Sequence, residues 1–174
     1  MDSIVVTPKG AVKVVKVYTA PYWVHNLTDT EWKRQKLRFA ALLAGIAVFY
    51  AAAAFLPSGS SHWAPVGLFG GLALAALVFL AGGMTSYLFC PRKMTVYEHR
   101  HSTSSVCCWS LLTALGMTIT GAMSGVYLLV IGGDELLLVL TSAFCYLISA
   151  ASAYTIYRTE RATEYYKEEN DNIL

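Results

Sequence analysis

Four long apolar runs dominate the pattern of hydrophobic and polar positions along the chain. They extend over residues 37–56, 64–89, 106–131 and 136–157, and their only charged side chain is Arg38, at the edge of the first run. A helix needs about 20 apolar residues to cross the hydrocarbon core of a bilayer. The pattern therefore predicts an all-α, polytopic membrane protein with four transmembrane helices.

The connections between these runs differ in charge. Residues 57–63 and 132–135 contain turn-forming residues and no Lys or Arg. Arg92, Lys93 and Arg100 lie between the second and third runs, and further Lys and Arg precede the first run and follow the fourth. The positive-inside rule therefore predicts an up-down bundle in the plasma membrane with both termini on the cytoplasmic side.

Two helices are expected to begin before they enter the membrane. Thr28 with Glu31, and Thr95 with Glu98, match the T-x-x-E pattern of a capping box. Each box precedes its apolar run by about ten residues, so the first and third helices are expected to extend into the cytosol. A tandem duplication of two hairpins is one hypothesis for this recurrence, and chance repetition of a short pattern is the alternative.

This organisation divides the chain into three parts. They are a cytoplasmic N-terminal segment, residues 1–27, a four-helix transmembrane domain, residues 28–157, and a cytoplasmic tail, residues 158–174. Within the first part, residues 12–17 consist only of Val and Lys and have some strand character. The tail mixes acidic and basic residues, and it is expected to form a short solvated helix that frays at its end.

Composition narrows the classes of function. Hydrophobic residues make up 56% of the 174 residues and charged residues 14%, which is about half the share usual for a soluble domain. Charged side chains inside a span are the usual mark of an ion or proton relay, so charge-coupled transport is not expected. Hydroxyl side chains could line a passive pore, or they could bond to their own helix backbone. These are Thr113, Thr118, Thr120, Ser124, Thr141 and Ser142.

Cysteine and histidine gather near the predicted cytoplasmic ends of the spans. Cys90, His99, His101 and Cys107 have the sulfur and imidazole groups that zinc prefers, which makes them weak candidate ligands. Their C-x8-H-x-H-x5-C spacing matches no common site, and histidines two apart on a helix face different ways, so neither a metal nor another cofactor is expected. The neighbouring thiols of Cys107 and Cys108 also fit S-palmitoylation. Disulfide chemistry is not expected, because the two outer loops contain no cysteine.

Small residues recur at a spacing of four within the spans. Such residues allow helix backbones to approach closely, and packing is the main attraction between helices in lipid. We expect these positions to pack helices together, either within the chain or against a partner. The clearest examples are Gly67, Gly71, Gly121, Gly125, Ala40 and Ala44.

These patterns favour a function in binding other molecules rather than in catalysis. We expect a non-enzymatic accessory or structural subunit, or scaffold, that binds other membrane proteins or further copies of itself, as well as lipid, and no nucleic acid. The alternative is a small oligomeric channel, transporter or membrane-permeabilising protein, and a membrane enzyme is the third possibility. A basic and aromatic rim is expected to dock a protein or lipid headgroups, through Trp32, Lys33, Arg34, Tyr97 and Arg100.

Overall fold

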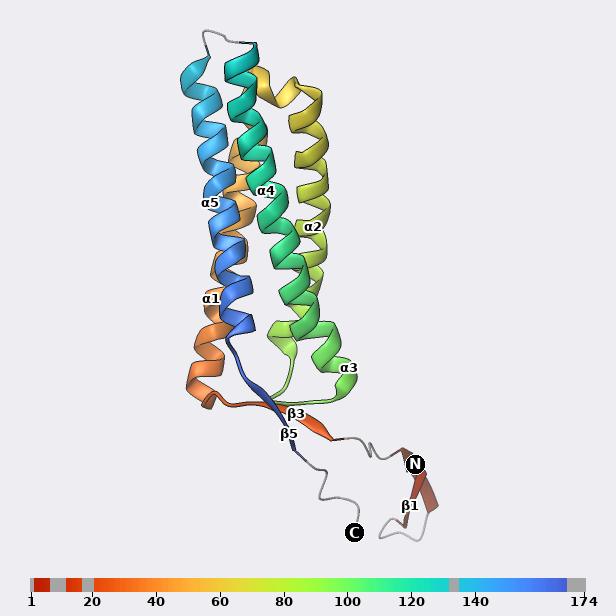
Figure 1. Ribbon diagram of the computed structural model, residues 1–174. Coiled ribbons are helices and arrows are strands. Elements are labelled where there is room, and N and C mark those ends of the chain that lie inside the picture. The colour runs from red at the N-terminus through yellow and green to blue at the C-terminus, as the bar shows by residue number, and fades with distance from the viewer. Residues whose placement is uncertain (1, 7–11, 17–20, 132–134, 169–174) are drawn as a thin grey trace.

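The computed structural model describes residues 2–6, 12–16, 21–131 and 135–168. Four long helices lie side by side (Figure 1). Each is long and apolar enough to cross a membrane, which confirms the prediction of a helical chain with four candidate spans. The predicted turn residues 132–134 and the last part of the tail, residues 169–174, lie outside the described residues. The long helices are α1 (Asp29–Phe55), α2 (Ala64–Phe89), α4 (Ser105–Val130) and α5 (Leu136–Arg161).

Both predicted capping boxes are present. The Thr28 amide donates to the Glu31 carboxylate at 2.9 Å, and the Glu31 amide donates to the Thr28 hydroxyl at 3.4 Å. Thr95 and Glu98 form the same reciprocal pair at 2.8 and 3.2 Å. The second box opens α3 (Val96–His99), which continues through the π-helical turn η2 (Arg100–Ser104) into α4.

A small antiparallel sheet lies at one end of the helices, which we call the sheet end (Figure 1). Its central strand β3 (Tyr22–His25) pairs with β4 (Lys93–Met94) on one edge and with β5 (Tyr165–Glu168) on the other. The expectation of a helical tail was therefore wrong. The tail forms β5 because α5 ends at Arg161 and the next residues find backbone partners on β3.

The strand character expected of residues 12–17 is confirmed for residues 12–16, and residue 17 lies outside the described residues. A second sheet consists of β1 (Asp2–Val6) paired antiparallel with β2 (Val12–Lys16). Within the described part of the N-terminal segment, the regular structure consists of strands, whereas the four candidate spans are helical.

Helix packing is uneven around the molecule. α4 packs extensively on both α5 and α2, and α5 packs on α1, whereas α1 and α2 approach each other much less. The buried positions of α1 are Trp32, Phe39, Ile46 and Ala53, which are seven residues apart and form one narrow stripe. Most of the surface of α1 therefore faces away from the other helices.

The opposite end of the helices contains η1 (Gly59–His62) between α1 and α2. We call it the loop end. The Gly59 amide donates to the Glu135 carboxylate at 2.7 Å, which joins the two connections at this end. Ser58 and Ser60 are buried at this end, whereas the His62 side chain is exposed.

Candidate functional site

A buried carboxylate lies at the sheet end, where four elements meet. Glu160, near the end of α5, is only 2% exposed. Its oxygens accept hydrogen bonds from the Tyr165 hydroxyl of β5 at 2.6 Å and from the Tyr87 hydroxyl of α2 at 2.7 Å. The Gln35 side-chain amide of α1 donates to it at 3.2 Å. Among the described residues Glu160 forms no ion pair, so neutral donors hold it in place.

The helical period positions Glu160 on the buried face of α5. Ala153 and Ile156, seven and four residues earlier, are fully buried and lie on the same face. The charge of residues 158–174 predicts a solvated tail that includes Glu160, whereas its spacing from Ala153 and Ile156 indicates the buried face of α5. Burial and the Glu160 carboxylate both raise the pKa of the Tyr165 hydroxyl, which therefore remains a protonated donor.

Aromatic rings continue from this network into the sheet. His25 of β3 stacks on Trp32 with 4.1 Å between ring centroids, and Trp32 lies 5.0 Å from the Tyr87 ring. Trp32 was expected at a docking rim, but it is only 5% exposed and packs inside this stack. Burial lowers the pKa of His25, and the nearby positive charge of Arg92 lowers it further. The imidazole is therefore neutral at pH 7.

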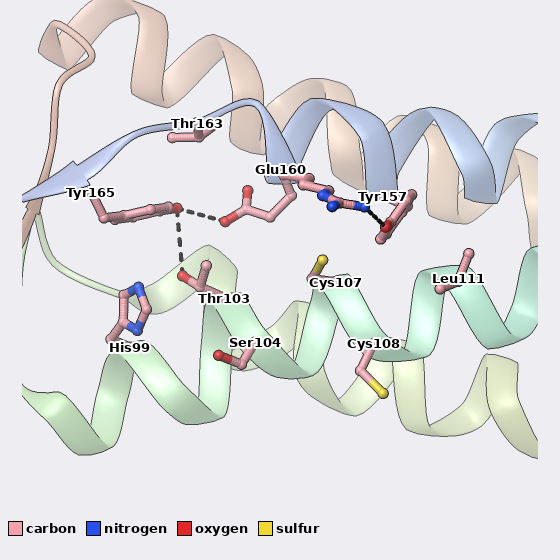
Figure 2. A pocket seen from close by; sticks show the side chains of 11 residues that line it. His99, Thr103, Ser104, Cys107, Cys108, Leu111, Tyr157, Glu160, Thr163 and Tyr165 are labelled. Carbon is pink, nitrogen blue, oxygen red and sulfur yellow. Dashed lines mark hydrogen bonds between the residues drawn. The ribbon is translucent and has the colours of Figure 1, made fainter.

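A groove of about 450 Å³ opens beside Glu160 (Figure 2). One wall consists of residues 99–111, from α3 through the start of α4, and the other of residues 157–165. Figure 2 shows the Cys107 side chain pointing across toward α5. We call this space the α4–α5 groove. Its lining is mostly apolar, and it also contains hydroxyl groups and one guanidinium group, from Arg161.

The candidate metal ligands are divided between two cavities. His99 and Cys107 line the α4–α5 groove. Cys90 and His101 line a smaller cavity of about 190 Å³ together with Glu98. In the described parts of the chain, no three His, Cys, Asp or Glu side chains gather in a way that could hold a metal ion. Burial raises the pKa of the Cys90 thiol, which keeps its proton.

The other members of the predicted docking rim are exposed. Lys33 and Arg34 lie on the first turns of α1, and Arg100 begins η2. Tyr97 is 70% exposed and its ring lies 4.3 Å from that of His101. The structure thus leaves four of the five predicted rim residues on the surface of the sheet end.

The predicted small-residue positions fall into two groups. A Cβ atom at Gly121 would lie 3.3 Å from the Ala143 carbonyl oxygen, so Gly121 packs against α5. A Cβ atom at Gly67, Gly71 or Gly125 would meet no atom within 4 Å. On α1, Ala44 is exposed and Ala40 is half-buried, so these alanines lie outside the buried stripe of that helix.

Comparison of the chain with protein-family models, with curated proteins and with solved structures finds no match.

Proposed function

We propose that this chain is a non-enzymatic integral membrane protein that acts as an accessory or structural subunit of a membrane complex. The observation that supports this function is an unfilled surface on α2. Gly67, Gly71, Val78 and Gly82 are exposed, and at about 100° per residue they lie within about 60° of one another around the helix. We call this surface the α2 glycine face. At each of its three glycines, an added Cβ atom would meet nothing within 4 Å.

Neighbouring glycines on α2 point inward. A Cβ atom at Gly83 would lie 3.0 Å from the Ser105 hydroxyl, and one at Gly70 would lie 3.7 Å from the Thr120 methyl group. Packing within the chain therefore uses Gly70 and Gly83, while the adjacent Gly71 and Gly82 stay open. Since glycines permit close helix contact in lipid, the α2 glycine face suits a transmembrane helix of another protein.

The proposed orientation places the sheet end and both termini on the cytoplasmic side of the plasma membrane. The four long helices then form an up-down bundle, with α1 and α3 extending into the cytosol. The distribution of charge supports this orientation, because the segments 57–63 and 132–135 contain no Lys or Arg in the sequence. The exposed side chains of Lys33, Arg34, Tyr97 and Arg100 would be available to an acidic protein surface or to lipid headgroups.

A passive channel remains the alternative function. The hydroxyls of Thr118, Thr120 and Ser124 donate to carbonyl oxygens four residues earlier, at 2.8, 2.8 and 3.1 Å. Ser142 donates to the Val139 carbonyl at 3.0 Å. These hydroxyls are therefore bonded to their own helix backbones, which favours the packing interpretation over a polar pore lining within one chain. A channel would require several copies of the chain around a common axis.

Substitution of Gly71 by Leu tests the proposed partner surface. Gly71→Leu should release the partner because the added side chain separates the two helices, and it should not unfold α2, since Leu favours helix more than Gly does. Ala151→Leu, at an exposed position of α5, is the matched control and should keep the partner bound. The measurement is co-purification in mild detergent followed by native mass spectrometry.

Three results of this experiment have different meanings. A heteromeric complex that is lost only with Gly71→Leu supports the accessory function. A homo-oligomer would favour the channel instead. A bare monomer, together with no crosslinked product in intact membranes, would overturn the accessory function.

A further inference from the structure

We infer that the α4–α5 groove binds one anionic membrane phospholipid, with an acyl chain between the helices and the phosphate at Arg161. The groove has about 450 Å³ of space, which is within the range of about 300–1,000 Å³ for small-molecule sites. This site is distinct from the α2 glycine face, and it depends only on the membrane-spanning character of the helices.

The groove crosses the boundary between apolar and polar parts of the chain. α5 has no charged residue from Leu136 to Tyr157, and then Arg158, Glu160 and Arg161 follow within one turn. On the facing wall, Leu111 lies at the apolar end and His99 at the polar end. These two residues are about 18 Å apart along the helix, at 1.5 Å per residue. A ligand that fills the groove must therefore be polar at one end and apolar at the other.

Arg161 provides positive charge beside Tyr157, where the apolar run of α5 ends. It is the only Lys or Arg among the residues that line the groove. Its guanidinium donates to the Tyr157 hydroxyl and lies 5.8 Å from the centre of that ring, an arrangement that orients it along the wall. Arg161 forms no ion pair with any described residue, so its remaining N–H groups can donate to a phosphate.

The nearby Glu160 carboxylate does not occupy this guanidinium. Its two oxygens are directed toward the donors Tyr165, Tyr87 and Gln35, and the side chain is almost fully buried. Ser104, on the opposite wall, is exposed and adds a hydroxyl donor to the mouth of the groove. The Arg161 guanidinium and the Ser104 hydroxyl are therefore both able to donate to a phosphodiester oxygen.

The test is a lipid titration of the purified full-length protein in detergent, followed by native mass spectrometry. The probes are phosphatidylglycerol, phosphatidylcholine with the same acyl chains, and inorganic phosphate alone. We expect one phosphatidylglycerol molecule to bind, with at least about tenfold preference over phosphatidylcholine. Arg161→Gln should reduce this affinity by about tenfold or more. The matched control is Arg158→Gln, which removes the same charge from an exposed position outside the groove and should have little effect.

A second pair of variants tests the apolar part of the groove. Leu111→Trp should fill the space and prevent binding, whereas Leu112→Trp, at a 43% exposed position outside the groove, should not. Equal losses for Arg161→Gln and Arg158→Gln would indicate general surface charge and overturn the site. Equal binding of the two lipids, binding of inorganic phosphate as tightly as of phosphatidylglycerol, or full binding by Leu111→Trp would also overturn it.

Discussion

Glu160 connects α5 to three other elements at the sheet end. Three side chains from three other elements, Gln35, Tyr87 and Tyr165, donate to its carboxylate. Tyr87 is fully buried and Tyr165 is half-buried, and both hydroxyls would lose this acceptor if the carboxylate were absent, whereas the Gln35 amide also donates to Tyr87 and Thr163. A buried polar group without a partner lowers the free energy of unfolding by more than one hydrogen bond raises it. Loss of the Glu160 carboxylate should therefore destabilise the protein.

Glu160→Leu should lower the free energy of unfolding by on the order of 3 kcal/mol, because it removes the acceptor of the buried Tyr87 hydroxyl and of the half-buried Tyr165 hydroxyl. The measurement is chemical or thermal denaturation of the purified protein in detergent. The control is Glu164→Leu, at an exposed position that accepts one side-chain hydrogen bond, from Asn26 at 3.3 Å. This control should change stability by less than about 0.5 kcal/mol. Similar small losses for both variants would show that the network contributes little.

At the scale of helices, two glycines of one small-residue motif have different surroundings. Gly121 brings α4 against the backbone of α5, whereas Gly125, one turn later, faces open space. The two positions belong to one small-residue motif, but only one of them is at a contact within the chain. Spacing alone cannot separate them, because it places both on nearly the same side of the helix.

Substitutions at these two glycines should therefore differ in their effect on the isolated protein. Gly121→Leu forces α4 and α5 apart, and it should destabilise the protein by about 1–3 kcal/mol, as overpacking does in other cores. Gly125→Leu should be neutral or slightly stabilising, since Leu favours helix. Thermal unfolding in detergent measures both. Equal destabilisation by the two substitutions would contradict the close α4–α5 contact at Gly121.

At the scale of the whole molecule, the two ends have different chemistry. The sheet end contains the sheet, the buried Glu160 network and the exposed side chains of Lys33, Arg34 and Arg100, whereas the described residues of the loop end, 57–63 and Glu135, include no Lys or Arg. The two hairpins also pack differently, since α4 and α5 contact along their lengths and α1 and α2 do not. The capping boxes thus open hairpins of similar pattern and dissimilar packing.

The proposed orientation predicts which end reacts with an impermeant reagent. In a background without the native cysteines, His62→Cys at the loop end should be labelled by a membrane-impermeant maleimide in intact cells. Tyr97→Cys at the sheet end should be labelled only after permeabilisation. Both positions are exposed, whereas Ser60 and Ser102 are each 1% exposed and unsuitable as probes. The reverse labelling pattern would overturn the orientation, and with it the expectation that both termini are cytoplasmic.

The sequence by itself determined the four candidate spans and both capping boxes. The length of an apolar run and a T-x-x-E pattern involve only residues that are close together in the sequence. Short segments of sequence are therefore sufficient to predict the spans and the capping boxes. The exposure of Lys33, Arg34 and Arg100 follows from the same reasoning, because charged side chains are seldom buried without a partner.

Only the tertiary structure decided the rest of the candidate site. β5 exists because β3, more than 100 residues earlier, offers it a free edge, and no local signal in the tail specifies that partner. Trp32 is buried because His25 and Tyr87 cover it from other elements. The choice between Gly70 and Gly71, or between Gly82 and Gly83, depends on where α4 lies. All of these features arise from contacts between segments distant in sequence, and those contacts form only when the whole chain packs.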